Sequence, residues 1–576
     1  MRRSTSDSLF YSLCILLIVS FFVIAINISA GPFNDESAHE NEIAPGVGIE
    51  SSVKQRRREL SSLETWKKKE LPPTEVKAAK PSNSSTFLGI YVREAYRVSN
   101  EEIRFVYLEN QDNRISLKAN VPMNGWKPVE WFCFNATCFD YLFCSMATRI
   151  GKIQLPQNAR HEPFIQLSAD NNDEYTLMPV NDVRIRPEFH IYPHTLGVCL
   201  QPIFFFADWT IIIQFFESWI AQGATKFYFY LHSYTWQTRK VLDFYKDSLG
   251  DGLELLDWSD LPVHSKDRGN YDKDPNSRVF RHGATAFMHD CMLRARSHVK
   301  FVANTDLDDL PVSNILNISE TLNQVSKRHS NAAQFKADWI LSHQPQHWDS
   351  IHTPRDVNFL LHSVKVIQTQ NIRWDYRVSK KMFHRPERVV HFDMHSVYRN
   401  EISDDNANQY TMIELFENTS LYFLHLRRFE RHLLNPTPID FNNNFNYSLL
   451  MKLNTKMLDQ YMQRMKGTKF RDVLLSPWSS DARQTIRDLE QCRREAFGTI
   501  LDDKNQMCQQ SSAGCEGMLS AGIPFIKTSI TWVNVAHKAL FNIVKFAYNE
   551  PTSDWTPRQG RLKDSTTEFP CYIQVW

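Results

Sequence analysis

The segment DLDDLP places the carboxylates of Asp306, Asp308 and Asp309 directly after the apolar stretch VKFVANT. Acids at positions i and i+2 can converge on one hard divalent cation, and that cation can bind phosphate oxygens in its remaining positions. The spacing therefore predicts a site for a metal ion and a diphosphate. Such triplets also occur in solvated turns and helix caps, but a place at the end of a buried strand favours the catalytic interpretation.

Basic residues and histidines farther along the chain could complete this site. The segment VSKKMFHRPERVVHF holds Lys381 and Arg385, whose cations could neutralise the charge that develops on a departing diphosphate. His395 and His425 lie in strand-like sequence, and a neutral imidazole could join the acids as a metal ligand. The alternatives are a solvated strand face for the cations and a structural role for the histidines.

Alternating strands and helices must position these residues. Strand-like stretches are VCLQPIFFF, KFYFYLH, GLELLDW and VKFVANT, and helix-like stretches are WTIIIQFFESWI, TWQTRKVLDFYKDSL and RHGATAFMHDCMLRARS. This order predicts an α/β domain over residues 195–460, with a mainly parallel sheet flanked by helices. Ligands of such sheets bind beyond the carboxyl ends of the strands, where the acids stand. No P-loop motif is present, and no GxGxxG follows a strand.

The rest of the chain divides by composition. Residues 86–194 alternate between short strand-like runs and turn residues, so we expect a small β-rich domain before the α/β domain. Residues 461–576 contain helix-like stretches and four cysteines, which predicts a helical C-terminal region. The cysteine spacings favour disulfides over zinc, with the pairing left open. Cys291 lies in a helix-like stretch and is interpreted as a buried free thiol.

The N-terminus carries a candidate membrane span. Residues 9–28 are apolar without a formal charge, and twenty residues of helix reach about 30 Å. Arginines precede the run and acids follow it, which predicts a single-pass type II signal-anchor with residues 1–8 in the cytoplasm and residues 29–85 as a luminal stem or linker. A cleaved signal peptide is the alternative, although its apolar region is usually shorter. Glycosylation sequons at Asn83, Asn135, Asn317, Asn418 and Asn446 agree with a luminal glycoprotein.

The charge balance argues against nucleic acid as a partner. The chain has 66 Lys plus Arg and 65 Asp plus Glu, a net charge of +1. Such a balance gives no overall field that would attract a polyanion. A hydrophobic content of 42% also excludes a chain that is disordered throughout.

An ordered set of motifs resembles glycosyltransferase family 92, a large family in nematodes. The motifs are CLQPIFFFADWTIIIQFFESWIAQGATKFYFYLHS, HDCMLRA, FVANTDLDDL, KKMFHRPERV and FLHLRR, and the resemblance covers roughly residues 87–429. It implies a type II Golgi membrane protein with a GT-A-like catalytic domain. The characterised members are inverting β-galactosyltransferases that use UDP-galactose, Mn²⁺ and N-glycan acceptors, and we expect a similarity to β-1,4-galactosyltransferases.

The resemblance assigns roles to individual residues. Asp306 and Asp308 match the metal-binding acids, Lys381 and Arg385 match a Lys-x-x-x-Arg-Pro segment, His425 matches the His before a basic pair, and His395 matches less closely. Two positions depart from the family pattern. The acid after the Asp-x-Asp triplet is often Glu and is Asp309 here, and a Gln common at the start of the preceding helix is missing around Arg281 and His282.

These expectations combine into a metal-dependent transfer of a hexose, expected to be galactose from UDP-galactose or another nucleotide sugar, with inversion onto a glycoprotein glycan. Direct displacement needs a carboxylate base, and the candidates are Asp338, Asp349, Asp375 and Asp393, of which we select Asp375. A non-catalytic luminal protein that retains the fold and binds a glycan or a partner is the main alternative. A metal-dependent hydrolase of phosphate esters would need a second acidic cluster, which the sequence does not offer.

Overall fold

The structure is a computed structural model, and it divides into two compact units, residues 1–75 and 76–576. The described residues all lie in the second unit. They are 89–475 without 112–114, 122–124, 134–139, 141–143, 157–158, 160, 170–174, 186–190, 264–265, 269, 271–272, 314–316, 345–350, 368–379, 394, 396, 402–409, 416–420, 428–441 and 443–444, together with 484–485, 488–489, 508, 519, 524–528 and 533–534. The expected membrane span and stem lie outside these residues. Within the described part of the chain, no helix is long and apolar enough to cross a membrane.

A nine-stranded sheet occupies the N-terminal part of the described chain. Its strands are β1 (Ile90–Arg97), β2 (Glu102–Asn110), β3 (Leu117–Asn120), β4 (Trp126–Pro128), β5 (Glu130–Cys133), β6 (Met146–Gln154), β7 (Phe164–Ala169), β8 (Thr176–Asp182) and β23 (Val533–Asn534). The order is β4-β3-β7-β8-β1-β2-β6-β5, with β23 paired to β1. Phe105 and Tyr107 of β2 share a buried cluster with Ile165 and Leu167 of β7, so the two halves of the sheet face each other.

A ten-stranded sheet follows it in the chain. Its strands are β9 (His194–Ile203), β10 (Lys226–Leu231), β12 (Leu253–Asp257), β13 (Val299–Thr305), β14 (Asp309–Ser313), β15 (Ala332–His343), β16 (Lys365–Val366), β17 (Lys380–His384), β20 (Thr411–Leu415) and β21 (Leu421–Arg427). Four neighbours, in the order β12-β10-β9-β13, run parallel as the sequence predicts. Beyond them the sheet is mixed, because β17 runs antiparallel to both β13 and β15.

Two small sheets, five α-helices and several short 3₁₀ helices complete the described elements. The small sheets pair β11 (Ser233–Thr235) with β22 (Phe525–Lys527) and β18 (Val389–Phe392) with β19 (Val397–Asn400). The helices are α3 (Trp209–Ala221), α4 (Trp236–Leu249), α5 (Ala284–Ala295), α6 (Ile318–Arg328) and α7 (Ser448–Met465). The predicted alternation from β9 to β13 is therefore confirmed, whereas α7 crosses the boundary expected at residue 460. The whole is a mixed α/β structure with helices flanking the sheets.

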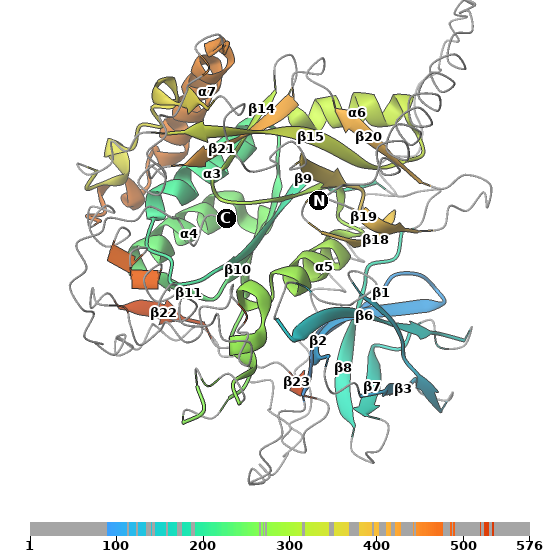
Figure 1. Ribbon diagram of the computed structural model, residues 1–576. Helices are drawn as coiled ribbons and strands as arrows, with labels where there is room; N and C mark the ends of the chain where they lie inside the picture. Colours follow the sequence, from blue (N-terminus) through green and yellow to red (C-terminus); the bar gives the residue numbers. More distant parts are fainter. Residues whose placement is uncertain are drawn as a thin grey trace, which may run out of the picture. The chain divides into compact units, whose positions relative to one another are not determined.

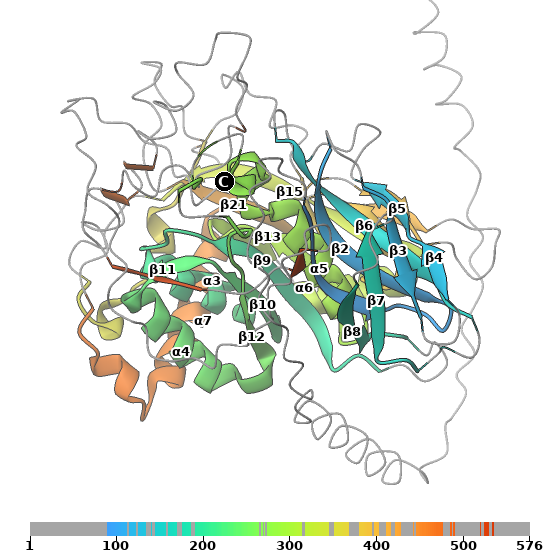
Figure 2. The same cartoon turned by 90° about the horizontal axis from the view of Figure 1, so that it is seen from below.

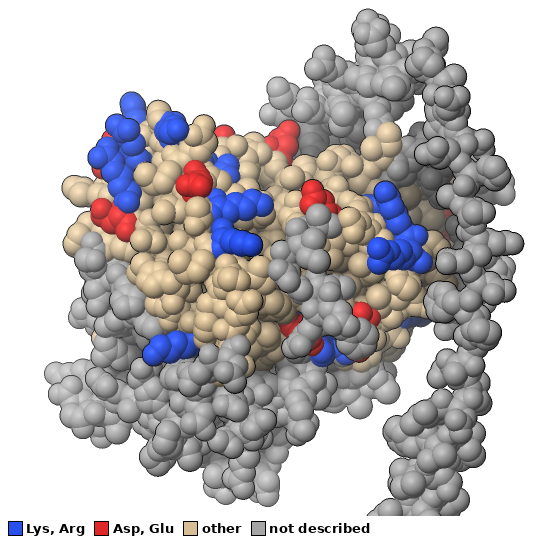
Figure 3. Space-filling model, turned by 90° about the horizontal axis from the view of Figure 1, so that it is seen from above, with Lys and Arg blue, Asp and Glu red and all other residues tan. Residues whose placement is uncertain are grey.

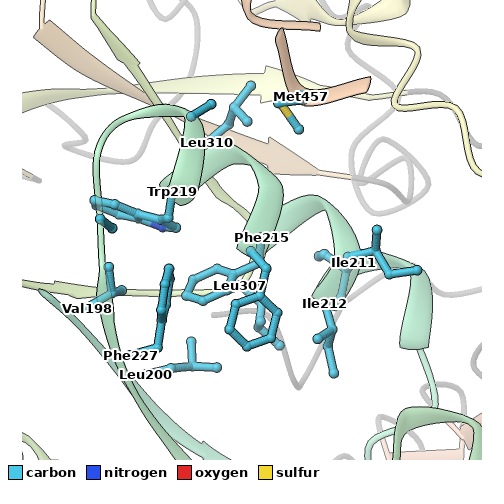
Figure 4. Packing of buried hydrophobic residues seen from close by; sticks show 14 of the residues in the cluster. Val198, Leu200, Ile211, Ile212, Phe215, Trp219, Phe227, Leu307, Leu310 and Met457 are labelled. Atoms are coloured by element: carbon cyan, nitrogen blue, oxygen red, sulfur yellow. The ribbon is translucent and has the colours of Figure 1, made fainter. Parts of the chain in front are cut away.

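Helix α3 forms the centre of the larger core. Asp208 caps its first turn by accepting a hydrogen bond from the backbone N–H of Ile211 at 3.3 Å. Nearly every residue of the helix is buried, including Phe215 and Trp219, which lie against Phe227 of β10 (Figure 4). An apolar helix on an apolar strand run buries both surfaces at once, and this burial stabilises the packing of the helix on the sheet.

Helix α5 lies between the two large sheets, against β9 and β13 on one side and β1, β2 and β6 on the other (Figures 1 and 2). The phenol of Tyr96 on β1 donates to Asp290 Oδ1 of this helix at 2.7 Å, and Tyr230 of β10 donates to Oδ2 at 2.6 Å. Cys291 of α5 forms a disulfide with Cys199 of β9. The expectation of a free thiol at Cys291 was therefore wrong, because its partner stands inside a buried strand 92 residues away.

Charged side chains do not gather into one large field on the face drawn in Figure 3. Lys and Arg lie there in separate groups with a few Asp and Glu among wide uncharged areas (Figure 3).

A second disulfide, Cys144–Cys508, links the β-rich part to the C-terminal region.

Candidate active site

The parallel strands bring their carboxyl ends to one edge of the ten-stranded sheet. Leu231 at the end of β10 lies opposite Ile203 of β9 and Asp257 of β12, and Thr305 at the end of β13 lies opposite Leu200. The predicted acids follow Thr305 directly. Side chains from segments distant in sequence therefore meet at this edge, as expected for a ligand site in an open α/β sheet.

Asp306 is held by a buried ion pair and an amide. Its Oδ2 lies 2.7 Å from Lys381 Nζ of β17, and its Oδ1 accepts a hydrogen bond from Gln201 Nε2 of β9 at 2.5 Å. All three side chains are buried. The carboxylate is thus fixed in position by residues of the two strands that flank β13 in the sheet.

Asp309 accepts five contacts and organises the rest of the site. Oδ1 accepts from Trp339 Nε1 at 3.0 Å and lies 2.9 Å from His425 Nδ1. Oδ2 accepts from the backbone N–H of Asp306 at 3.0 Å, from the hydroxyl of Thr305 at 3.2 Å, and pairs with Lys381 Nζ at 2.6 Å. These contacts use the lone pairs of the carboxylate, so Asp309 is suited to orienting its neighbours.

His425 connects Asp309 to Asp308. It lies opposite Asp309 on the paired strands β14 and β21, and Trp339 covers its ring with centroids 4.2 Å apart. With Nδ1 donating to Asp309, its Nε2 is an acceptor directed at Asp308 Oδ2, 3.3 Å away. A carboxylate that fixes one ring nitrogen so that the other can bind a metal is a recurrent arrangement.

The residues present fit a divalent metal ion. Ligand atoms of Asp308, Asp309 and His425 lie within 4.8 Å of one another. Three carboxylates and one ammonium, those of Asp306, Asp308, Asp309 and Lys381, give the group a net charge of −2 with a neutral imidazole (−3 + 1). A divalent cation would balance that charge, and oxygen and imidazole ligands suit Mn²⁺ or Mg²⁺. We call Asp306, Asp308, Asp309, Lys381 and His425 together the acidic centre.

The protonation states follow from burial and pairing. Burial alone would raise the pKa of the Asp309 carboxyl, but the Lys381 ammonium and the hydrogen bond from His425 hold it well below its usual range. Burial would lower the pKa of Lys381, but Asp306 and Asp309 raise it above its ordinary value. Both groups are therefore charged at neutral pH.

The structure does not bring every predicted residue to this centre. Arg385 follows β17 at the amino edge of β13, four residues or about 13 Å along the strand from Lys381, and pairs there with Glu387 at 2.5 Å. Its expected partnership with Lys381 at the diphosphate does not fit this geometry. Lys381 itself is enclosed between two carboxylates instead of standing open to a ligand.

His395 lies beside the acidic centre. The Nδ1 of His395 donates to the carbonyl oxygen of Lys380 at 2.7 Å. Burial lowers the pKa of His395, and the Lys381 ammonium lowers it further, so the ring is neutral.

Of the four candidate bases, two, Asp375 and Asp349, lie outside the described residues. Asp338 pairs with Lys380, and Asp393 accepts from the phenol of Tyr398 at 2.6 Å.

A second polar cluster lies beyond the ends of β10 and β12 and consists of His232, Asp260 and His282. His232 Nε2 lies 2.7 Å from Asp260 Oδ1, and the other oxygen of Asp260 pairs with Arg268 and with Lys527 Nζ at 3.0 Å. The three residues could geometrically hold a metal. The two added cations make the cluster positive, which opposes a cation and favours an anionic or polar ligand.

The second cluster is also where the backbone is strained. Phe205, Arg281 and His282 have φ values of 45°, 43° and 52°, which non-glycine residues rarely adopt. Burial lowers the pKa of His232 to about 4, so its ring is neutral. The ring of Phe204 lies 4.5 Å from that of His282, and Gln201 three residues earlier contacts the acidic centre. The two groups are thus joined by one short segment at the same edge.

Sequence reasoning missed several of these residues. Gln201 interrupts the apolar run VCLQPIFFF, and this single polar residue near a strand end was a usable signal. His232 ends KFYFYLH in the same way. Trp339 gave no signal, because only the register of β15 beside β21 brings it over His425.

One of the comparisons with known proteins supports a glycosyltransferase. Residues 194–468 match the model of glycosyltransferase family 92, which supports that family and a glycosyltransferase activity with a nucleotide-sugar donor. No curated protein matches the chain. Solved structures that match include the amylomaltase from Corynebacterium glutamicum, with 12% identity over 32% of this chain and 25% of that chain at a TM-score of 0.12. Another is S. aureus TarS, with 13% identity over 51% of this chain and 49% of that chain at a TM-score of 0.22. The chain thus covers about a quarter and about half of these two proteins, and likeness at this level carries no argument.

Proposed function

We propose that this protein transfers a hexose, with UDP-galactose as the first donor to test, from a nucleotide sugar to a glycan with inversion at the anomeric carbon. The observation that carries the proposal is the acidic centre, where Asp308 and His425 Nε2 face each other with Asp309 fixing the ring. The match over residues 194–468 supports the same reaction class. We also propose that the domain that carries the acidic centre is GT-A-like.

In this proposal Asp308 and His425 hold Mn²⁺, with Asp306 beside them and His395 as a further candidate ligand. An ion held there would supply positive charge that offsets the charge developing on the diphosphate. Asp309 keeps the Nδ1 proton on His425, so that Nε2 stays available as a ligand. Lys381 offsets the repulsion between Asp306 and Asp309 and keeps both carboxylates in place before any ligand arrives.

The second polar cluster is suited to the nucleoside side of the same donor. It lies at the same strand edge, carries a net positive charge, and has the buried ring of Phe204 packed 4.5 Å from the ring of His282. A donor that extends from the acidic centre along the ends of β9 and β10 would reach it. We assign the diphosphate to the acidic centre and the nucleoside to the second cluster.

An acceptor hydroxyl must lose its proton as it attacks, and Asp375 remains our candidate for the base. Asn at this position would keep the volume and remove the basic carboxylate. We therefore expect Asp375→Asn to lose sugar transfer while it retains binding of UDP and Mn²⁺. Retained transfer would move the role to Asp338, Asp349 or Asp393.

We also propose a secretory-pathway location, as a single-pass type II membrane glycoprotein of the Golgi with the catalytic part in the lumen. The disulfides Cys199–Cys291 and Cys144–Cys508 fit an oxidising compartment. The apolar run at residues 9–28 is the candidate anchor. Immunolocalisation of the tagged full chain, with glycosidase sensitivity as the readout for luminal exposure, tests both parts.

The experiment for the reaction is a screen of UDP-sugars for UDP release by the full chain, with and without Mn²⁺ and an N-glycan mixture. Asp308→Asn serves as the site variant and Asp247→Asn, an exposed acid on α4, as the matched control. We expect Mn²⁺-dependent release that the glycan mixture stimulates, lost in Asp308→Asn and kept in Asp247→Asn. No release above background by the wild type for any donor would move the non-catalytic binding protein ahead, and equal release by wild type and Asp308→Asn would contradict the assignment of the site.

A further inference from the structure

The outer face of the nine-stranded sheet carries a row of side chains that the proposed transfer reaction does not use. Asn120 of β3 lies opposite Trp126 of β4 and opposite Gln166 of β7, and Gln166 lies opposite Leu177 of β8. Directly opposite residues point to the same face of a sheet. This row therefore runs across four strands, on the side away from the buried cluster between the two halves of the sheet.

Two aromatic rings stand exposed on this face. Trp126 is 40% exposed and Tyr175, which directly precedes β8, is 49% exposed, so both are large apolar groups left in water. Their ring centroids lie 6.3 Å apart with the planes inclined at 56°. Leu177 at 48% exposure adds to the same apolar surface. A contiguous exposed apolar patch rimmed by polar residues is typical of an interaction site.

The polar groups around the rings are almost all uncharged. Asn120 Nδ2 donates to Gln166 Oε1 at 2.8 Å, which orients both amides along the row. The one formal charge is Lys118, whose ammonium lies 5.5 Å from the centroid of the Trp126 ring. No acid lies among these described side chains. The face therefore complements a neutral ligand that offers both an apolar surface and hydroxyl groups.

We propose that Trp126, Tyr175, Asn120 and Gln166 form a binding platform for a neutral β-linked oligosaccharide, separate from the acidic centre. A pyranose ring with equatorial hydroxyls presents a flat face of C–H groups, which stacks on an aromatic ring, and hydroxyls at its edge, which bond to amides. The platform would hold a glycan chain by non-reacting sugars. This goes beyond the proposed transfer, because the platform requires neither a donor nor a metal ion.

The test is direct binding of reducing-end-labelled chitotetraose and cellotetraose to the full chain by fluorescence polarisation, without UDP-sugar or Mn²⁺. We expect Trp126→Leu to weaken binding about tenfold or more, since Leu keeps apolar character but not the flat ring, and Trp126→Tyr to retain most of it. Met462→Ala, an exposed apolar residue on α7, is the control and should bind as wild type does. Asp308→Asn should also bind as wild type does, because the acidic centre is not involved.

Several outcomes would overturn the platform. The wild type could bind neither oligosaccharide, or Trp126→Leu could bind with an unchanged Kd. Loss of binding in Asp308→Asn with retention in Trp126→Leu would place the sugar at the acidic centre instead. Tyr175→Leu gives a second, independent variant, and thermal unfolding of each variant separates lost binding from lost folding.

Discussion

Asp309 and His425 lie opposite each other on the antiparallel strands β14 and β21, with Asp309 Oδ1 2.9 Å from His425 Nδ1. The pairing of two strands thus sets the tautomer of the histidine that faces Asp308. Because the register fixes this contact, the centre is formed by the fold before any ligand binds.

Removing the charge of Asp309 should weaken metal binding, because Asp309 orients His425. An amide in Asp309→Asn cannot orient His425 and Lys381 as the carboxylate does, and loss of such an orienting partner typically costs about 10- to 100-fold in metal affinity or activity. Titration of Mn²⁺ into wild type and variant, followed by electron paramagnetic resonance of the free ion, measures the change. A Kd that matches the wild type would show that Asp309 does not position His425.

Lys381 should be needed for stability more than its neighbour Lys380. Lys381→Met leaves two buried carboxylates without their cation, and breaking a buried pair in this way costs about 3–5 kcal/mol. Lys380 pairs with Asp338 at a half-buried position, so Lys380→Met should cost about 1 kcal/mol or less. Mn²⁺ should raise the Tm of Lys381→Met more than that of wild type, because the ion restores positive charge. Equal Tm values for both variants contradict this assignment.

Stability should fall in mild acid because of buried histidines beside α5. Burial, with a further contribution from neighbouring His289, lowers the pKa values of His384 and His391 to about 3. The unfolded chain, with a histidine pKa near 6.5, then binds more protons below that pH, so stability is lost as the pH falls from about 6.5 toward 3. Each such group should cost about 2 kcal/mol at pH 5 relative to pH 7.

His384 offers the variant that checks this pH dependence. Its two ring nitrogens have no hydrogen-bond partner among the described residues, so His384→Leu removes a titrating group without breaking a described bond. Chemical unfolding of wild type and variant between pH 7 and pH 5 should give a shallower loss of stability for the variant. Parallel pH profiles would show that His384 does not contribute.

The disulfide between β9 and α5 should stabilise the fold. Cys199→Ala and Cys291→Ala should each lose about 2–5 kcal/mol, and the double variant should lose little more, because the same bond is broken only once. Differential scanning calorimetry of the three variants checks the magnitudes. Additive losses, or a free thiol at Cys291 in the denatured wild type under non-reducing conditions, contradict the pairing.

Much of the fold was predictable because its signals are local. The apolar run before Asp306 and the helical spacing in Trp209–Ala221 depend on neighbouring residues alone, and the structure has both elements. The antiparallel position of β17 between β13 and β15 depends on hydrogen bonds to strands far away in sequence. The residues of β17 do not indicate whether it runs parallel or antiparallel to them.

The site was predictable in part for the same reason. Asp306 and Asp308 follow a strand whose end is visible in the sequence, and His425 lies in a strand-like segment. Arg385 was expected to act with Lys381 because both match the Lys-x-x-x-Arg-Pro segment of the family, but an extended chain separates residues four apart by about 13 Å. Trp339 and Asp309 acquire their roles only through pairing across strands.

Transfer of a sugar at the acidic centre must increase the mass of the acceptor, so that mass is the decisive measurement. The full chain is incubated with UDP-galactose, Mn²⁺ and a released N-glycan mixture, and the glycans are analysed by mass spectrometry beside Asp308→Asn. We expect a gain of one hexose with the wild type, which is absent with Asp308→Asn and absent without Mn²⁺. Free galactose with unmodified glycans would indicate a hydrolase, and an identical gain with Asp308→Asn would contradict the assignment of the site.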